Sequence, residues 1–345
     1  MTSERWKFAY TTRRVRHEAI ASVVGGDEVP RAGDLVLAEV LKIGQHARIE
    51  LIDGRRAQMF RGDRIVIAYG NRYAPDQFEG VVPEDLGECH LLAAGGVAGR
   101  VLCQHNGMND ATRIAPIGLL YDVEGRRMNL RDYALGAPPR DVPLPPTIAV
   151  VGTSMNSGKT TVVASMVRGL RAAGLNAMAC KITGTGAGGD AWLMKDSGAE
   201  LVLDFTDAGA VSTSLLTLPE LEGIMDTLLG HLAAAGAEAI VFEVADGLLQ
   251  PETAALVAAP AFRAAVDAVI FASGEAMGAC GGVTWLQRHG LPVIAASGLM
   301  TSAPLAVREA GDVLPVPVFS REDLETGAVA YQLLPQQQEA KLVAA

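Results

Sequence analysis

The pattern of hydrophobic and polar positions changes near residue 140. Before it, short runs alternate with a period near two, which is typical of half-buried strands. These runs are 35–43, 47–52, 56–60 and 64–69, followed by apolar stretches at 91–102 and 112–122. Asp53-Gly54 lies between two of them, as a hairpin turn does. Closely spaced short strands of this kind predict a small barrel or sandwich.

From Thr147 onward, β-branched apolar runs alternate with amphipathic stretches. Alternation of this kind predicts a parallel sheet covered by helices on both faces. We expect helices at 160–173 and 219–235, the second from the helical spacing of its leucines. The expected strands are 147–152, 176–182, 200–205, 239–243, 267–272, 292–296 and 314–318. The fold class is therefore α/β, a parallel-sheet domain preceded by a smaller β-rich domain.

A proline-rich segment joins the two regions. Residues 136–146 contain five prolines, which favours an extended, semi-rigid linker. We therefore divide the chain into a barrel- or sandwich-like domain at 1–136, a linker at 137–146 and a second domain at 147–345.

The second domain begins with a strand, a glycine-containing loop and a helix. Backbone N–H groups of such a loop and of the helix N-terminus bind phosphate. Lys159 is expected to reach the β- and γ-phosphates, and the Thr160 hydroxyl to bind Mg²⁺. The predicted nucleotide-binding residues are Gly152, Thr153, Ser154, Met155, Asn156, Ser157, Gly158, Lys159, Thr160 and Thr161.

Polar residues at the ends of later strands are expected to meet this loop, because ligands bind beyond the carboxyl ends of parallel strands. Lys181 ends the second strand, and we expect it to act with Lys159 on the transferring phosphoryl group. Asp190 begins the next helix, and Glu243 ends the strand at 239–243. Carboxylate oxygens suit Mg²⁺, so Thr160, Asp190 and Glu243 form the predicted metal set. Helix capping by Asp190 is the alternative.

The net charge and the amino-acid composition exclude some classes of binding partner and cellular location. The net charge of −10 argues against nucleic acid as the main partner. We identify no apolar run long enough to span a membrane and no signal peptide, and four irregularly placed cysteines suggest reduced thiols. We therefore expect a cytoplasmic protein.

The phosphate loop has five residues, Thr153 to Ser157, between Gly152 and Gly158, where the usual pattern has four. This longer loop resembles that of dethiobiotin synthetase and the related amidotransferase ligases. The resemblance covers about residues 147–320 and includes Lys181, Asp190 and Glu243 at matching places. It implies ATP and Mg²⁺ as cofactors, a small-molecule substrate that bears a carboxylate or an amine, and a homodimer. The domain also resembles the phosphate-loop half of a family that contains D-glutamate N-acetyltransferases.

Three functions follow as hypotheses. The first is an ATP- and Mg²⁺-dependent ligase or synthetase, which phosphorylates a carboxylate or carbamate of a metabolite for ligation or ring closure. The second is a nucleotide-switched maturation or partitioning ATPase, and the third an acyltransferase on a phosphate-loop fold. The sequence departs from the synthetase pattern at Lys181-Ile182 and at Ala296-Ser297-Gly298, so substrate and base preference stay open. The absence of an Asn-Lys-x-Asp motif favours ATP over GTP.

Other candidates have two interpretations each. The loop at 70–79 either closes over a substrate, with Arg72 holding its carboxylate or phosphate, or is a surface loop anchored by Tyr73 and Phe78. Asp204 and Asp207 either line a substrate site or are solvated acids beside a turn. The residues Cys89, His90, Cys103 and His105 lack the usual zinc spacing, which favours ordinary thiols over a metal site.

Overall fold

The computed structural model describes residues 6–139 and 141–334, and these form two compact units. Unit 1 contains the region up to Gly136 together with the segments 183–192 and 204–216. Unit 2 contains 137–182, 193–203 and the chain from Thr217 onward. Two loops that leave the second half of the chain therefore fold with the first half. None of the helices in the described ranges has the length and apolarity needed to cross a membrane.

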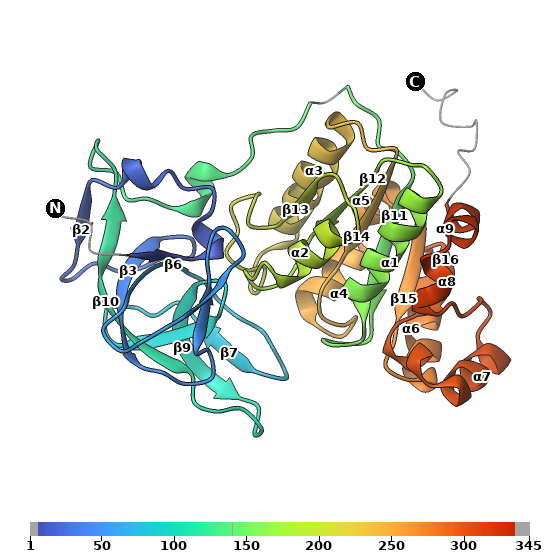
Figure 1. The fold of residues 1–345 in the computed structure, drawn as a ribbon, viewed down its shortest axis with the longest axis horizontal. Coiled ribbons are helices and arrows are strands. Elements are labelled where there is room, and N and C mark those ends of the chain that lie inside the picture. The colour runs from blue at the N-terminus through green and yellow to red at the C-terminus, as the bar shows by residue number, and fades with distance from the viewer. Residues whose placement is uncertain (1–5, 140, 335–345) are drawn as a thin grey trace. The chain divides into compact units, whose positions relative to one another are not determined.

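Unit 1 is built on a closed barrel. Its strands are β1 (Lys7–Phe8), β2 (Ser22–Val24), β3 (Leu35–Lys42), β4 (Arg48–Glu50), β5 (Arg56–Gln58), β6 (Arg64–Tyr69), β7 (Phe78–Val81), β8 (Cys89–Ala93), β9 (Val97–Gln104) and β10 (Thr112–Tyr121) (Figure 1). The pairings run β6–β3–β10–β8–β9 and return from β9 to β6, so five strands close on themselves. Of the two architectures expected, barrel or sandwich, these pairings form a barrel, and β4 and β5 pair as the hairpin around Asp53-Gly54.

Alternate positions of the barrel strands enter two separate apolar clusters. Val36, Ile65 and Ile67 belong to one, whereas Leu35 and Val66 belong to the other. Both faces of β3 and β6 are therefore buried, which explains why their sequences are apolar at nearly every position. Short 3₁₀ turns complete this half of the chain at Tyr10–Thr12, His17–Ala19 and Leu130–Tyr133.

Unit 2 carries a six-stranded sheet in the order β13-β12-β14-β11-β15-β16. Its strands are β11 (Thr147–Gly152), β12 (Ala177–Lys181), β13 (Val202–Asp204), β14 (Ala239–Glu243), β15 (Ala268–Ala272) and β16 (Val293–Ser297). The pairings of β11, β12, β14, β15 and β16 are parallel, as predicted. The expected strand at 314–318 is reduced to a single bridge between Ala296 and Val318.

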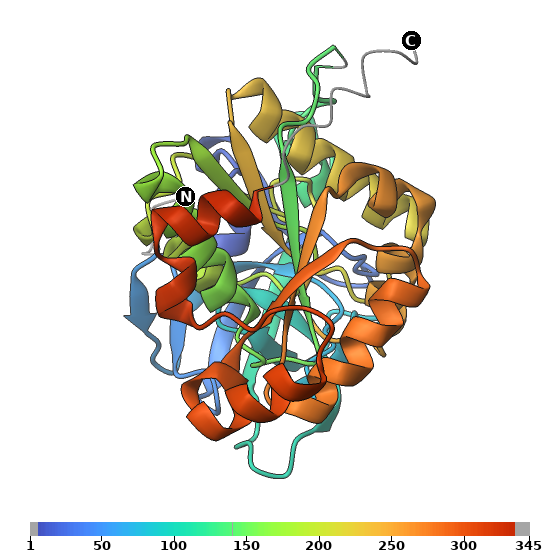
Figure 2. The same cartoon turned by 90° about the vertical axis from the view of Figure 1, so that its right-hand side faces the viewer.

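Helices cover both faces of this sheet (Figure 2). They are α1 (Lys159–Ala172), α2 (Gly189–Asp196), α3 (Leu218–Ala234), α4 (Pro251–Ala258), α5 (Pro260–Ala265), α6 (Ala276–Arg288), α7 (Pro304–Val313), α8 (Arg321–Leu324) and α9 (Gly327–Leu333), with a 3₁₀ turn at Leu299–Ser302. One face holds α1, α8 and α9, whose Val163, Leu324 and Ala330 share a core with Ile148 of β11. On the other face, the Phe262 ring of α5 packs edge-on against Phe242 of β14.

A buried ion cluster holds the segment 204–216 within unit 1. The Arg13 guanidinium lies 2.6 Å from Asp207 and 3.1 Å from Asp204, and the Tyr10 hydroxyl donates to Asp204 at 2.6 Å. Both carboxylates are buried, so of the two interpretations of Asp204 and Asp207 the one that makes them solvated acids was wrong. Burial alone raises a carboxyl pKa, but the Arg13 charge and hydrogen bonds keep the pKa of Asp204 below its usual value. Burial and the neighbouring Asp204 charge raise the pKa of Asp207.

This cluster predicts a large effect of removing its cation. Arg13→Met leaves two buried carboxylates without their main counter-charge, so we expect a loss of about 3–5 kcal/mol in the free energy of unfolding. Arg14→Met is the matched control, because Arg14 is one-third exposed and lies 3.6 Å from Asp207. Its loss should stay below about 1 kcal/mol. Urea unfolding at neutral pH measures both, and equal losses would contradict the role given to Arg13.

Candidate functional site

The phosphate loop connects β11 to α1 in a conformation that requires its glycine. Gly158 caps α1 with a φ of 94°, in the left-handed region, where a side chain is strained. Asn156 also has a positive φ, 59°, which asparagine tolerates better than most residues. The loop therefore turns sharply and leaves the first N–H groups of α1 pointing out of the helix end. This is the geometry that binds phosphate.

Neighbouring strand ends hold the loop in place. The Thr153 N–H donates to Ala272 of β15 at 3.0 Å, and the Leu299 N–H donates to Ser157 at 2.9 Å. The turn after β14 packs just as closely, because a Cβ on Gly247 would lie 2.0 Å from the Thr153 carbonyl oxygen. The loop is thus supported by the elements that follow β14, β15 and β16.

The strand register brings Lys181 and Glu243 together. They are direct partners in the parallel pairing of β12 with β14, and Lys181 Nζ lies 3.1 Å from Glu243 Oε1. Val150 of β11 pairs with Glu243 on its other side, so this carboxylate lies next to the strand that leads into the phosphate loop. Lys159 donates to the Ser154 carbonyl oxygen at 2.6 Å and thereby folds its side chain back along the loop.

Two buried oxygens in this region are suited to a further ligand. Glu243 Oε2 and Ser157 Oγ are both buried without a hydrogen-bond partner among the described residues. An unsatisfied buried acceptor is costly, and its presence at a loop of this shape points to an additional bound group. A carboxylate oxygen and a hydroxyl beside the phosphate loop fit Mg²⁺ and the phosphate oxygens or waters around it. The residues present therefore fit a magnesium nucleotide.

Asp190 belongs to a different part of the structure. It begins α2 within unit 1, where it adds to the negative charge around Glu50, while Thr160 and Glu243 belong to unit 2. Among the described residues no group of three or more His, Cys, Asp or Glu side chains is arranged to hold a metal. The metal role of Asp190 stays a prediction, as do those of Thr160 and Glu243.

Asp246 is a site residue that the sequence analysis passed over. It follows β14 with a φ of 61° in a turn against the phosphate loop, and the charges of Lys159 and Lys181 act on it. Burial raises its pKa to about 6, although the two lysines oppose this shift. The sequence signal was the Asp246-Gly247 pair directly after an apolar strand.

The loop at 70–79 does not offer Arg72 to a ligand. The Arg72 side chain is buried, donates to the Leu92 carbonyl oxygen, and donates to Gln77 Oε1 at 2.9 Å. Its interaction with Phe78, whose ring centroid is 5.9 Å away, also holds it inside the barrel. Of the two interpretations of this loop, the one in which Arg72 holds a carboxylate or phosphate was therefore wrong, since the Arg72 charge fixes the loop. Phe78 is fully buried, whereas Tyr73 is exposed.

Three solved structures are similar to parts of this chain at low sequence identity. No protein-family model and no curated protein matches the sequence. Signal recognition particle receptor FtsY from Elizabethkingia anophelis is similar at 16% identity and a TM-score of 0.38, over 50% of this chain and 56% of that one. Its complex with GDP gives 13% identity and a TM-score of 0.40, over 58% and 66% of the two chains.

The 54 kDa signal recognition particle protein from Aeropyrum pernix K1, in complex with GDP, gives 18% identity and a TM-score of 0.36. That match covers 55% of this chain and 44% of the other. This chain thus spans less than two thirds of each of these three proteins. Similarity at this level carries no argument about fold or activity. The parallel sheet, the phosphate loop and the helix after it establish a P-loop NTPase fold for unit 2.

The raised pKa of Asp246 gives a pH-dependent prediction. The pKa of Asp246 in the folded protein lies above the ordinary 3.8, so ionisation of this carboxyl lowers the free energy of unfolding. This loss is absent below about pH 4, grows between pH 4 and 6, and is complete above pH 6. Asp246→Asn should therefore raise the free energy of unfolding by about 1–3 kcal/mol above pH 6 and by little near pH 4. Asn also tolerates the positive φ.

Urea unfolding across this pH range, without nucleotide, measures the difference. Asp196→Asn is the control, because Asp196 is an exposed carboxylate of the same unit. A gain for Asp246→Asn that is equal at pH 4 and pH 8 would contradict the burial argument.

Proposed function

We propose that unit 2 binds a nucleoside triphosphate with Mg²⁺ and catalyses transfer of its γ-phosphoryl group, to water or to an acceptor. The observation that carries this proposal is the Lys181–Glu243 pair beside the phosphate loop, with the second Glu243 oxygen buried and unsatisfied. ATP is the expected nucleotide, because the chain has no Asn-Lys-x-Asp guanine motif.

Each residue has a distinct role in this reaction. The loop N–H groups and Lys159 hold the phosphates, and Lys181 adds a second positive charge where negative charge builds up in the transition state. Bound Mg²⁺, held by Thr160 and Glu243, would neutralise the phosphate oxygens. Glu243 also fixes the Lys181 ammonium through Oε1. Phosphoryl transfer depends mainly on positioning and electrostatics, so these groups suffice without a covalent nucleophile.

Use of the phosphoryl group for switching is favoured by one feature of the chain. The segment 183–192 begins two residues after Lys181, and the segment 204–216 begins at the last residue of β13, yet both belong to unit 1. The chain thus passes from a strand that ends in the site residue Lys181 straight into the other unit. This continuity supports a nucleotide-switched protein, in which the bound nucleotide determines the conformation of unit 1. Activation of a metabolite carboxylate for ligation is the second candidate, favoured by the lysine at position 181.

Substitutions of Lys159 and Lys181 test nucleotide binding and phosphoryl transfer, which both candidate functions require. Lys159→Ala should abolish detectable ATP binding by calorimetry, because the phosphates lose their main charge contact. Lys181→Met should lower kcat by about 100-fold and change KM little, because its charge acts mainly in the transition state. Lys195→Met is the control, since Lys195 is exposed on α2 and donates to the Glu200 carbonyl oxygen. Tight ATP binding by Lys159→Ala would refute the phosphate-loop assignment.

Product analysis separates the two uses of the nucleotide. With γ-labelled ATP, a switch should release phosphate slowly and at a rate that a library of carboxylate- and amine-bearing metabolites does not change. A ligase should show hydrolysis or label transfer that depends on one metabolite and forms a new product. Metabolite-dependent turnover would thus exclude the switch as the complete function.

A further inference from the structure

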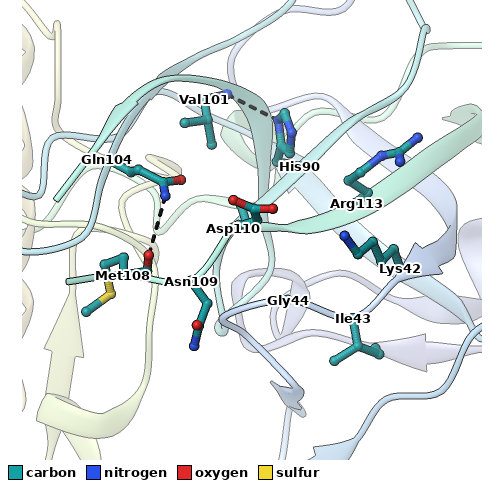
Figure 3. Close-up of a pocket in the computed structure, with 11 residues that line it drawn as sticks. Lys42, Ile43, Gly44, His90, Val101, Gln104, Met108, Asn109, Asp110 and Arg113 are labelled. Carbon is teal, nitrogen blue, oxygen red and sulfur yellow. Dashed lines mark hydrogen bonds between the residues drawn. The ribbon is translucent and has the colours of Figure 1, made fainter. Parts of the chain in front are cut away.

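A polar cavity opens on the surface of unit 1, and none of its lining residues belongs to the candidate nucleotide site. It encloses about 680 Å³ and is lined by residues of β3, β8, β9 and β10 and of the turn before β10. Volumes of this size hold small-molecule ligands. Lys42, His90, Asp110 and Arg113 contribute its titratable side chains (Figure 3).

The sheet register places three of these side chains in one row. Arg113 of β10 is the direct antiparallel partner of Lys42 on one side and of His90 on the other. Direct cross-strand partners project from the same face, with their Cβ atoms close together. Lys42, Arg113 and His90 therefore form a row across three adjacent strands, along one wall of the cavity.

An irregularity in β3 creates this row. The register shifts between Arg113 and Ile114, whose partners are Lys42 and Val40. Because Arg113 and Ile114 face opposite ways, Lys42 and Val40 must do so too, although they are two positions apart and would otherwise share a face. The bulge therefore turns Lys42 out of the face that buries Val40 and brings it beside Arg113.

The two positive charges of this row, on Lys42 and Arg113, lower the stability of the folded protein unless a negative charge lies nearby. Like charges directly opposite each other on neighbouring strands are unfavourable. Arg113 pairs with Glu88, but both side chains are about half exposed. Lys42 is exposed as well and forms no ion pair among the described residues. A bulge that creates a row of like charges facing a cavity points to a ligand of opposite charge.

His90 adds a neutral donor to the row. Its Nδ1 accepts a hydrogen bond from the Val101 N–H at 3.3 Å, so the proton of the neutral ring lies on Nε2. Burial and the charges of Arg113 and Arg100 lower the pKa of His90, opposed by Asp110, so the ring is neutral at pH 7. Lys42, Arg113 and His90 Nε2–H are therefore all donors, while Asp110 is an acceptor at the same cavity.

We propose that this cavity of unit 1 binds a small phosphorylated metabolite that also carries an amino or hydroxyl group. The phosphate, which has three terminal oxygens, is held by the Lys42, Arg113 and His90 row. The second group donates to Asp110. The site lies wholly within unit 1 and does not depend on the nucleotide reaction of unit 2.

Calorimetric titration of the full-length Lys159→Ala protein tests this proposal, since that background removes the phosphate loop as a competing site. Inorganic phosphate and phosphoethanolamine are the probes. Both should bind, with phosphoethanolamine tighter because its ammonium reaches Asp110. Lys42→Gln should weaken both at least 10-fold, a loss of about 1.4 kcal/mol. Arg61→Gln, at an exposed site of unit 1 outside the cavity, should change neither.

Two further measurements separate a binding role from a structural one. Lys42→Gln should raise the thermal midpoint of the ligand-free protein, because it relieves the repulsion in the row. Asp110→Asn should strengthen inorganic phosphate binding and remove the preference for phosphoethanolamine. The proposal is overturned if Lys42→Gln leaves both affinities unchanged, or if the probes bind the wild-type chain but not the Lys159→Ala protein.

Discussion

The candidate nucleotide site depends on the register of three adjacent parallel strands. Because β11, β14 and β12 pair in order, Val150, Glu243 and Lys181 lie side by side at the carboxyl edge of the sheet. A shift of one residue in either pairing would send a side chain to the opposite face. The apolar residues before these positions fix the register, since both faces of the sheet are covered. Core packing in unit 2 thus determines where its charges meet.

The sequence predicted this part of the structure well because the signals are local and periodic. The phosphate loop, α1 and the strands ending at Lys181 and Glu243 lie where the apolar runs place them. The strand order itself, and hence the direct Lys181–Glu243 pairing, is a property of the whole sheet and was not readable from either strand. Asp246 was missed because its pKa depends on burial that only the folded turn provides.

Long-range pairing also explains the predictions that failed. Arg72 lies in a polar loop and Asp204 lies beside a turn, and the sequence around each is typical of exposed residues. Their structural partners are remote in sequence: Leu92 for Arg72, and Arg13 for Asp204. For the same reason the sequence did not predict which segments belong to unit 1. Nothing local to 204–216 indicates that this segment folds with the N-terminal barrel.

Unit 1 contains two arrangements of charged side chains that differ in how their charges are compensated. Around Arg13, a partly buried cation faces two buried carboxylates, and the Tyr10 and Thr206 hydroxyls donate to one of them, so the charges are compensated inside the protein. Along Lys42 and Arg113, like charges adjoin an open cavity, and a bulge was needed to bring them together. The first arrangement contributes to the fold by itself. In the second, the proposed anion would relieve the repulsion between Lys42 and Arg113, because Lys42 forms no ion pair among the described residues.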